Sequence, residues 1–460
     1  MARHQKDLPP TRDEKISRTV SDDDVLTALE RLTSYYPVAI DMGLDRVFRL
    51  LHDLGDPHLN LPPVIHIAGT NGKGSTLAFT RAILEAAGKK VHAFTSPHLV
   101  RYNERVILAG KEISNALLLE CLNECERVNA DRPITFFEIT AIASFLAFSR
   151  VDADYVLLET GMGGRLDATN VVPDPAMTLI TTISNDHAKF LGPTLPRIAG
   201  EKAGILKPGT PCILGYQTQE GLDAGVDIVF EHKAEEVTAP LFKAGDEWAI
   251  HQTEKGCLFN GFGCDIETPP PNLIGGHQIL NAGAAIAGLV YLRQNAGWDI
   301  SDKAICEGIQ SARWQARLQR LTEQESLMNV PSSLELWLDG GHNDSAGAVL
   351  AEQAERWNIE DGRDLHLVVA MLNTKSPVEF LERLGPKATS ITCIPVPGDD
   401  LSFTPDELKD RLRHIQGLPG IDTAPDWPAA IQSCIQSECK GRILTCGSLY
   451  LAGHILSKSV

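Results

Sequence analysis

The sequence feature that most constrains the fold is a glycine-rich segment, Gly69–Ser75, which lies between two segments of regular apolar pattern. The β-branched run Val64–Ala68 predicts a strand, and Thr76–Ala87 has apolar residues at helical spacing and is followed by Gly88. In this order, the N–H groups of the loop and the positive end of the helix form a cradle for an anion. Lys73 can reach the outer phosphates of a nucleotide. The segment therefore predicts a phosphate site on an α/β fold.

The spacing of this loop departs from the common phosphate-binding pattern G-x-x-x-x-G-K-[ST]. That pattern requires a glycine at Ile67, and it has Ser or Thr where Gly74 follows the lysine here. The alternative interpretation is a tight glycine turn with a solvated lysine. Because the strand, the loop, the lysine and the helix occur in the required order, we favour the phosphate cradle.

Strand and helix patterns alternate along most of the chain. A helix is predicted over 21–34, and the strands predicted after Val64–Ala68 are Val91–Thr95, Tyr155–Glu159, Met177–Ile183 and Pro211–Gly215. The segment 218–271 has no clear assignment. After an irregular stretch, the alternation resumes with strands at Leu334–Leu338, Leu365–Met371 and Arg442–Cys446 and helices at Ser345–Trp357, 404–414 and from Ser448. Such alternation predicts mostly parallel sheets.

The predicted elements divide the chain into two α/β domains. Residues 21–311 are expected to form a P-loop ATPase domain with a mostly parallel sheet flanked by helices. Residues 312–460 are expected to form a smaller, Rossmann-like α/β domain, and residues 1–20 a disordered tail. A chain of 460 residues is too long for one ordinary core, which favours this division.

Charge and apolar content exclude several classes of protein. The formal net charge of −18 would repel a phosphate backbone, so no nucleic acid is expected as a partner. The longest apolar stretches, 139–148 and 284–292, are about half the length that a membrane-spanning helix needs. The first twenty residues lack the apolar core of a secretory signal, and the ten cysteines have no disulfide spacing. We expect a cytoplasmic protein with no membrane partner.

Candidate metal ligands follow two of the predicted strands. Glu159 ends a strand and enters the glycine-rich segment Thr160–Asn170, and His187 follows Asp186 at the end of the next strand. Ligands of open α/β sheets collect at the carboxyl ends of strands, so Glu159 is placed to hold a metal. His187 alone is open to a second interpretation, as a core or surface histidine. By spacing alone, Lys202 is expected to be a solvated helix lysine.

Taken together, these motifs resemble the Mur ligase superfamily, and most closely its folylpolyglutamate synthase and dihydrofolate synthase branch of the bifunctional bacterial type. The resemblance runs from about Gly43 to the final helix and covers most of the chain. It rests on nine elements in order: Gly69–Thr76; Ser96–Leu99 with Arg101–Arg105; Thr135–Glu138; Glu159–Asn170; Asp186-His187; Glu201–Ile205; His277-Gln278 with Asn281; Leu338–Gly340; and Gly447–Gly453.

The resemblance implies an ATP-dependent ligase that forms C–N bonds in folate biosynthesis and polyglutamylation. The carboxylate of one substrate attacks the γ-phosphate of ATP, and the amino group of L-glutamate then displaces phosphate from the acyl phosphate. Dihydropteroate and reduced folates are the implied acceptors. A lysine and Mg²⁺ neutralise charge on the transferring phosphoryl group in such chemistry.

The resemblance also assigns individual residues. The implied nucleotide ligands are Thr70, Asn71, Gly72, Lys73, Gly74, Ser75, Asn281, Arg317 and Asp339. The implied ligands of two Mg²⁺ ions are Ser96, Glu159, His187 and Lys202, with Lys202 carboxylated to a carbamate, which reverses the expectation from spacing. The implied catalytic set is Lys73, Lys202 and His342. The implied acceptor-binding residues are Thr135, Phe136, Phe137, Glu138, Leu166, Asp167 and Ala168, although core packing remains an equal alternative for each phenylalanine ring.

Two departures from the family pattern leave local loop geometry open. The usual Pro-Gly-Arg is Gln315-Ala316-Arg317 here, and the usual Gly-Ala-His-Asn-Pro is Gly340–Asp344. Because the phosphate loop and Asp339 lie on different predicted domains, catalysis would require domain closure.

The alternatives are an enzyme that only extends folates and a nucleotide-binding regulatory module without catalysis. A peptidoglycan Mur ligase is disfavoured, since its preceding domain of roughly 100 residues has no room before Gly69. A monomer is expected.

Overall fold

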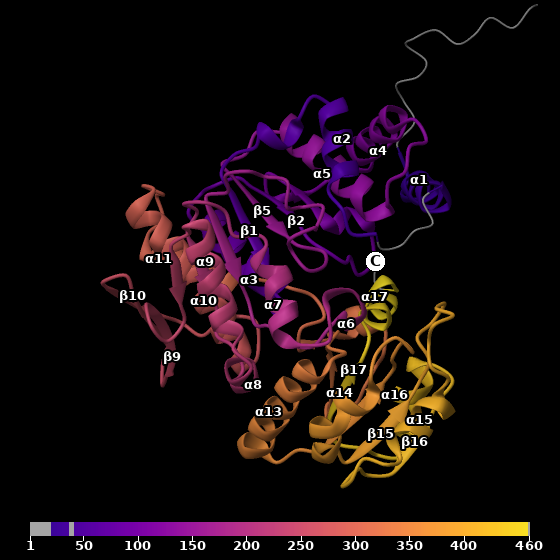
Figure 1. Cartoon of the computed structure of the whole chain (residues 1–460). Coiled ribbons are helices and arrows are strands. Elements are labelled where there is room, and N and C mark those ends of the chain that lie inside the picture. The colour runs from indigo at the N-terminus through magenta and orange to yellow at the C-terminus, as the bar shows by residue number, and fades with distance from the viewer. Residues whose placement is uncertain (1–19, 36–40, 459–460) are drawn as a thin grey trace, which may run out of the picture.

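The computed structural model describes residues 20–35 and 41–458. The described chain forms two lobes, each built on one large sheet with helices on both of its faces (Figure 1). We call them the larger lobe, which contains β1–β11, and the smaller lobe, which contains β12–β17. This arrangement confirms the predicted α/β fold with mostly parallel sheets.

The larger lobe is organised around β1, a strand whose side chains alternate between the two faces of the sheet and are all buried. Within the described residues its sheet has eight strands in the order β4-β3-β2-β5-β1-β6-β7-β8, and all pairs are parallel except β2–β3 and β3–β4. The strands are β1 Val64–Ala68, β2 Val91–Phe94, β3 Val106–Leu108, β4 Lys111–Glu112, β5 Tyr155–Glu159, β6 Met177–Ile180, β7 Cys212–Leu214 and β8 Leu241–Lys243. Because β1, β5 and β6 are adjacent and parallel, the loops after them lie side by side.

Helices cover both faces of this sheet. Ile65 and Ile67 of β1 pack into one apolar core with α3, α10 and α11, and Val64 packs into the opposite core with α2, α4 and α5. The helices are α1 Asp22–Tyr35, α2 Asp45–Asp53, η1 Pro57–Leu59, α3 Lys73–Ala86, η2 Tyr102–Arg105, α4 Asn115–Asn129, α5 Phe136–Arg150, α6 Ala188–Leu191, α7 Leu195–Ala203, α8 Gln219–Asp223, α9 Val226–Val237, α10 Gly276–Asn295 and α11 Asp302–Ser311.

The segment 218–271, which had no sequence assignment, forms α8, α9, β8 and a separate antiparallel sheet. That sheet contains β9 Trp248–Thr253, β10 Gly256–Gly261 and β11 Cys264–Thr268. Trp248 and Phe259 bury its inner face in the same core as α10. This meander gives α10 a second packing surface on the side away from the large sheet.

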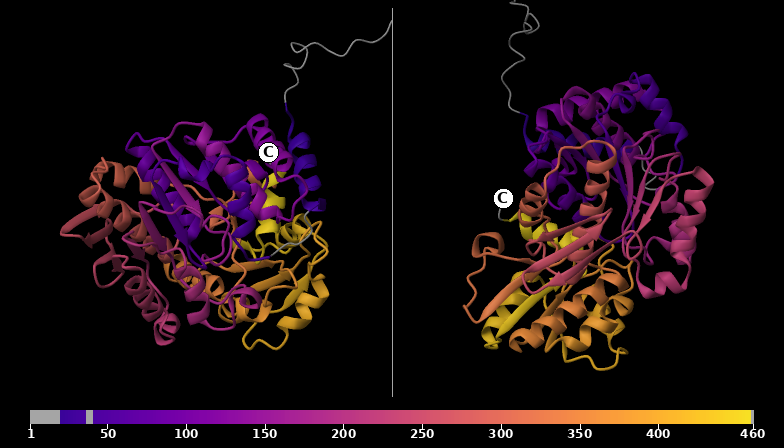
Figure 2. Two further views of the ribbon diagram at one scale, coloured as in Figure 1. Left: turned by 45° about the horizontal axis from the view of Figure 1, so that its top comes forward. Right: turned by 90° about the vertical axis from the view of Figure 1, so that its left-hand side faces the viewer.

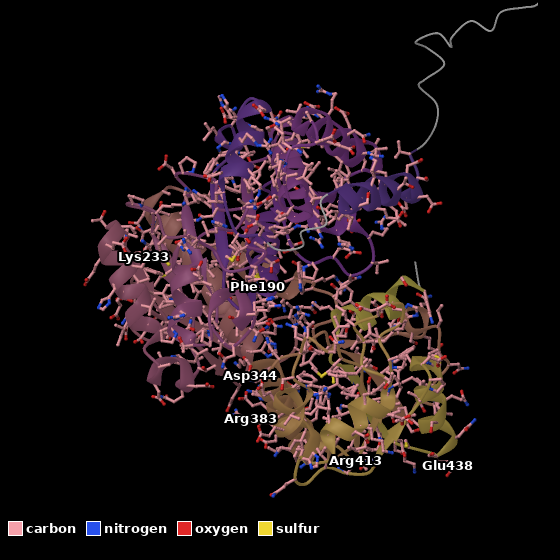
Figure 3. All side chains as sticks on the ribbon, turned by 45° about the vertical axis from the view of Figure 1, so that its right-hand side comes forward. Phe190, Lys233, Asp344, Arg383, Arg413 and Glu438 are labelled. Atoms are coloured by element: carbon pink, nitrogen blue, oxygen red, sulfur yellow. The ribbon has the colours of Figure 1, made fainter. Side chains whose placement is uncertain are left out.

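The smaller lobe has six strands in the order β12-β13-β17-β14-β15-β16 among the described residues. All pairs are parallel except β12–β13. Its elements are β12 Gln319–Arg320, α12 Glu323–Ser326, β13 Leu334–Leu338, α13 Asp344–Asp361, β14 Leu365–Val369, α14 Pro377–Leu384, η3 Gly385–Lys387, β15 Ser390–Cys393, α15 Pro405–Leu412, β16 Ile421–Thr423, α16 Trp427–Gln436, β17 Gly441–Cys446 and α17 Leu449–Ser457. Arg413 and Glu438 lie at the end of this lobe away from the larger one (Figure 3).

Packing supports a proposed domain boundary near residue 312. Ala312 belongs to the core of the larger lobe, whereas Ala316 and Leu318 belong to the two cores of the smaller lobe. The chain therefore passes from one lobe to the other between Ala312 and Ala316, and we propose domains with bounds close to the predicted 21–311 and 312–460. The predicted tail at 1–20 lies, apart from Val20, outside the described residues.

The smaller lobe lies against one end of the larger lobe, as two further views show (Figure 2). α17 reaches from the smaller lobe toward the larger one (Figure 1), and a Cβ atom added to its Gly453 would lie 2.0 Å from the carbonyl oxygen of Leu99. Only glycine permits this close approach. In the described part of the chain, no helix is long and apolar enough to cross a membrane, and all ten cysteines are free of disulfides.

Candidate functional site

The loop between β1 and α3 is shaped by two glycines. Gly69 and Gly72 have φ angles of 150° and 90°. Added Cβ atoms would lie 1.8 Å from Thr181 Oγ1 at the first position and 2.5 Å from Asn281 Oδ1 at the second. Side chains at these positions would therefore clash, and Asn281 of α10 lies directly beside the loop.

α3 begins at Lys73, three residues before the predicted start at Thr76. The N–H groups of Lys73, Gly74 and Ser75 thus lie in the first turn of a helix, where no intrahelical acceptor is available to them. Upstream, the N–H groups of Thr70 and Asn71 donate to the carbonyl oxygen of Thr182 at 2.9 Å and 3.3 Å. These two bonds anchor the loop to Thr182, which follows β6 along the chain. The N–H groups at the start of α3 remain available for an anion.

Lys73 and Glu159 form the centre of the site. Lys73 Nζ lies 3.9 Å from Glu159 Oε1 and donates to the carbonyl oxygen of Thr70 at 3.3 Å. The N–H of Ser96 donates to Glu159 Oε2 at 3.4 Å. Burial raises the pKa of Glu159, and the nearby Lys73 opposes that rise. The structure therefore brings a buried carboxylate, a cation and Ser96 together at the ends of β1, β2 and β5.

Lys202 is buried rather than solvated. Its side chain is in α7, the residue is 4% exposed, and its Nζ donates to the carbonyl oxygen of Gly69 at 2.7 Å. Burial lowers the pKa of Lys202 to about 7, and Lys73 adds to this effect. The expectation of a solvated lysine is wrong, because α7 turns this face toward the phosphate loop.

His187 and Asp186 lie between the two lobes. His187 Nε2 is 3.9 Å from Asp186 Oδ2, and Lys375 of the smaller lobe donates to Asp186 Oδ1 at 2.8 Å. Burial lowers the pKa of His187, which favours the neutral imidazole needed for metal binding. Burial alone would raise the pKa of Asp186, but His187 and Lys375 lower it to about 2. The ion pair therefore bridges the lobes beside the predicted metal ligand.

A reciprocal amide pair also joins the lobes. Asn71 Nδ2 donates to Asn343 Oδ1 at 3.3 Å, and Asn343 Nδ2 donates to Asn71 Oδ1 at 3.1 Å. Asn343 Oδ1 also accepts the N–H of Ala346 at 2.9 Å and so caps α13. The phosphate loop thus contacts the smaller lobe directly.

Asp339 shapes the loop after β13. Its Oδ2 accepts the N–H of Leu318 at 2.8 Å, and its Oδ1 accepts the N–H of Gly341 at 2.7 Å. Burial raises the pKa of Asp339, and Arg317 opposes that rise. Arg317 Nη1 donates to the carbonyl oxygen of Ala316 at 2.8 Å, and the charge of Arg317 also opposes the rise in the pKa of Glu159.

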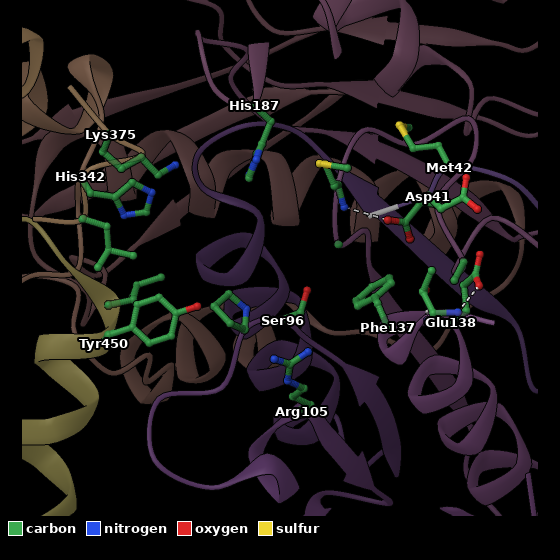
Figure 4. Close-up of a pocket in the computed structure, with 18 of the residues that line it drawn as sticks. Asp41, Met42, Ser96, Arg105, Phe137, Glu138, His187, His342, Lys375 and Tyr450 are labelled. Carbon is green, nitrogen blue, oxygen red and sulfur yellow. Dashed lines mark hydrogen bonds between the residues drawn. The ribbon is translucent and has the colours of Figure 1, made fainter. Parts of the chain in front are cut away.

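A cavity of about 400 Å³ lies between the lobes. His342, Lys375 and Tyr450 of the smaller lobe border one side of it, Phe137 and Glu138 of the larger lobe border the other, and Ser96 and His187 lie between them (Figure 4). Burial lowers the pKa of His342 to about 4, and its Nδ1 is 3.0 Å from the carbonyl oxygen of Gly340.

Most of the predicted acceptor-binding residues line this cavity: Thr135, Phe137, Glu138, Leu166, Asp167 and Ala168. Phe136 does not. Both rings are half-buried and pack against the same core: the centroid of Phe136 lies 6.3 Å from that of Tyr102, and the centroid of Phe137 lies 6.1 Å from that of Phe94, each in an edge-to-face arrangement. Successive residues of a helix point about 100° apart, and at the start of α5 Phe137 also lines the cavity whereas Phe136 does not.

Glu138 is held by partners of its own. Its Oε2 accepts the N–H of Thr135 at 2.7 Å in a capping box, and its Oε1 accepts Arg46 Nη2 at 2.8 Å. Burial of this carboxylate is thereby compensated. Asp167 is likewise buried: burial raises its pKa, and hydrogen bonds from Thr169, Met162 and Gly161 oppose the rise.

Several residues that line the cavity were given no role from the sequence, among them Arg105, Lys375, Ser448 and Tyr450. Arg105, Ser448 and Tyr450 fall within segments that carry the family resemblance. Lys375 follows β14 at its carboxyl end, so the strand-end rule that singled out Glu159 could have found it.

The two departures from the family pattern have local consequences. Ala316 occupies the position of the family's glycine with a φ angle of 53°, a left-handed conformation in which glycine is favoured. Asp344 replaces the family's proline as the first residue of α13, and its Oδ1 accepts the N–H of Ser345 at 2.7 Å. An acid in the first turn of a helix is favourable, so this end keeps a suitable residue.

Gly74 stands where the common phosphate loop has Ser or Thr, and Trp314 explains it. A Cβ atom on Gly74 would lie 2.6 Å from Trp314 Cζ2. We expect Gly74→Ser to displace the indole, to destabilise the protein by about 1–3 kcal/mol and to raise the KM for ATP. Urea unfolding and steady-state kinetics would measure both effects. Gly200→Ser in α7, where nothing lies within 4 Å of an added Cβ atom, is the matched control. Unchanged stability and KM in Gly74→Ser would contradict this packing argument.

The predicted metal ligands are chemically suited to a nucleotide-bound Mg²⁺. Among the described residues, no three His, Cys, Asp or Glu side chains come together to hold a metal alone. The predicted set contains two side chains of these types, Glu159 and His187, together with Ser96 and Lys202. Because Mg²⁺ prefers oxygen ligands and keeps several waters, the buried Glu159 with a hydroxyl and phosphate oxygens suits it.

Comparison with known proteins defines the class first. Residues 67–289 match the Mur ligase middle domain family. The chain is 32% identical over 430 residues to the dihydrofolate synthase/folylpolyglutamate synthase of Escherichia coli (strain K12), covering 93% of this chain and 94% of that protein. The chain therefore belongs to the dihydrofolate synthase/folylpolyglutamate synthase family of Mur ligases.

Solved structures agree with this membership. E. coli FolC in complex with DHPP and ADP has a TM-score of 0.83 at 30% identity, with 94% of this chain and 97% of that chain covered. A bifunctional folylpolyglutamate synthase/dihydrofolate synthase with Mn, AMPPNP and L-glutamate bound has a TM-score of 0.80 at 29% identity, with 95% and 97% covered.

Proposed function

We propose that this chain is an ATP-dependent ligase that joins L-glutamate to dihydropteroate and to reduced folates. The observation that carries the proposal is the cavity between the lobes. Its walls combine Ser96 and His187 beside the phosphate loop with Phe137 and Asp167, and Lys375 closes it from the smaller lobe. Relatives named for both activities, and FolC with DHPP and ADP bound, support this assignment.

The nucleotide lies along the phosphate loop. Lys73 and the N–H groups at the start of α3 bind the triphosphate, together with Thr70, Asn71 and Gly72. Asn281, Arg317 and Asp339 complete the nucleotide site from α10 and the smaller lobe. The Asn71–Asn343 pair joins the two lobes beside this site, and closure of the lobes over the substrates would exclude water from the reacting groups.

The reaction has two steps. The carboxylate of the acceptor attacks the γ-phosphorus of ATP, ADP leaves, and an acyl phosphate forms. The amino group of L-glutamate then attacks the acyl carbon, phosphate leaves, and the nitrogen loses a proton. Lys73 neutralises charge on the transferring phosphoryl group in the first step. His342 lies on the cavity wall of the smaller lobe and is assigned to the catalytic set with Lys73 and Lys202.

Ser96, Glu159, His187 and Lys202 are the proposed ligands of two divalent cations. When bound, Mg²⁺ neutralises the phosphates and orients them. The structure with Mn and AMPPNP bound supports a divalent cation in this family. Lys202 is proposed to be carboxylated: its amine nitrogen adds to CO₂ and loses a proton, which gives a carbamate. A buried ammonium group near Lys73 and two cations would be repelled, whereas a carbamate supplies two oxygens.

An enzyme that only extends folates remains the main alternative, and a non-catalytic nucleotide-binding regulator is the second. We further propose a monomer that acts in the cytoplasm without nucleic acid as a partner, in line with the net charge of −18. Since the substrates are themselves anionic, local groups such as Lys73, Arg317 and Mg²⁺ must supply their binding.

One assay tests the function and its dependence on metal. We expect ADP release in the presence of L-glutamate with dihydropteroate and, separately, with tetrahydrofolate, and a product mass increased by one glutamate residue. Excess EDTA should abolish turnover, and added Mg²⁺ should restore it, because the phosphates would otherwise keep their full charge.

Activity with tetrahydrofolate alone would identify an extension-only enzyme. Absence of turnover with every acceptor would favour the regulator, and turnover indifferent to chelation would refute the proposed metal role.

A further inference from the structure

Three buried polar side chains are linked in series by hydrogen bonds, from β1 to the loop 160–170. His66 Nε2 lies 2.9 Å from Thr169 Oγ1, and Thr169 Oγ1 lies 2.6 Å from Asp167 Oδ1. All three residues are buried. Of the three, Asp167 alone lines the cavity between the lobes, so His66 and Thr169 stand behind it.

The direction of each hydrogen bond follows from the groups involved. Asp167 accepts the N–H groups of Thr169 at 3.0 Å and of Met162 at 2.8 Å, which suits an ionised carboxylate. The single hydroxyl proton of Thr169 is therefore donated to Asp167, and its oxygen must accept from His66. Burial lowers the pKa of His66 to about 3, so the imidazole is neutral and carries its proton on Nε2.

These bonds fix the orientation of the carboxylate. Oδ1 is held by the backbone and side chain of Thr169, and Oδ2 is held by the N–H of Met162. The 2.6 Å contact is in the short range of charge-assisted hydrogen bonds. A ligand in the cavity therefore meets a carboxylate that cannot rotate freely.

His66, at the other end of this series of hydrogen bonds, lies on β1, the strand that leads into the phosphate loop. His66 lies three residues before Gly69, in a strand paired on both sides. A rigid strand thus supports both the loop that takes the nucleotide and, through Thr169, the carboxylate that faces the acceptor.

We propose that Thr169, held by His66, is a positioning residue that orients Asp167 toward the pterin-bearing acceptor. The inference rests on the proposed function and deepens it, because it names what holds a residue of the acceptor site. Neither Thr169 nor His66 touches the substrate.

Thr169→Val tests this, because valine has the same shape and lacks the hydroxyl. We expect the KM for dihydropteroate to rise roughly 10- to 100-fold, the range for loss of one hydrogen bond to a charged group. The KM for ATP and the kcat at saturating acceptor should change less than about threefold. Thr169→Ser keeps the hydroxyl and should restore the acceptor KM to within a few-fold of wild type.

A second variant separates positioning from stability. Thr169→Val leaves the buried N–H of His66 without its acceptor and should lower Tm, whereas His66→Leu combined with Thr169→Val removes that donor as well. We expect the double variant to regain Tm while its acceptor KM stays high.

Recovery of the acceptor KM together with Tm would overturn the inference, as would an unchanged acceptor KM in Thr169→Val. Wild-type protein without acceptor-dependent ADP release would instead refute the proposed function, and the inference with it.

Discussion

Lys73→Met is expected to lower kcat/KM by about 10³-fold or more while leaving the fold intact. Lys73 Nζ donates to the carbonyl oxygen of Thr70 in the phosphate loop and lies 3.9 Å from Glu159 Oε1. Charge that develops on the transferring phosphoryl group has to be neutralised in a site closed to water, where one missing cation has a large effect. ADP release at saturating glutamate and acceptor measures the loss.

The same substitution removes the cation beside the buried carboxylate of Glu159, so the ligand-free protein should still fold but with a somewhat lower Tm than wild type. The rise in Tm that ATP produces should shrink, because bound triphosphate no longer gains the contact with Lys73. Lys111→Met on the exposed edge strand β4 is the matched control and should change neither quantity. Full activity in Lys73→Met would rule out the phosphate-loop assignment.

The strands that position the site could be predicted from the sequence. β1 and β5 have the predicted bounds, because short β-branched and apolar runs buried on both faces are distinctive. The sheet 248–268 could not be assigned. Its strands mix polar and apolar residues, and its turns lack the Asn-Gly or Asp-Gly signal of a tight hairpin.

Which side of a helix faces the site depends on packing that spacing does not encode. Lys202 has the surroundings of a surface lysine in the sequence, yet α7 buries it against Gly69, 133 residues earlier in the chain. Phe136 and Phe137 are adjacent and chemically identical, and only the orientation of α5 decides that Phe137 lines the cavity. In each case a contact distant in sequence sets the outcome.

The contacts between the lobes were the least predictable part. Asn71 and Asn343 are 272 residues apart, and Asp186 and Lys375 are 189 apart. The expectation that Asp339 approaches the phosphate loop came from a family resemblance rather than from local pattern. The relation between the two lobes, and with it the cavity, therefore required the structure.

Lys202→Ala is the second change expected to abolish ligation, and its rescue distinguishes two chemistries for the same side chain. The residue is buried beside the phosphate loop and its Nζ donates to Gly69, so truncation leaves a small polar void beside Gly69 that faces the charge of Lys73. If the working group is a carbamate, the void lacks an anion, and added acetate or formate should restore part of the activity. If the working group is an ammonium ion, methylamine should restore it instead.

Lys207→Ala, five residues further along and beyond the end of α7, is the matched control and should remain active without additives. A direct measurement accompanies the rescue: wild-type crystals with ATP and Mg²⁺ should show density for one CO₂ on Lys202 Nζ. A bare ammonium group in that complex, together with rescue by methylamine, would overturn the carbamate. Rescue of Lys202→Ala by acetate, with no rescue by methylamine, would show that this position requires an anion.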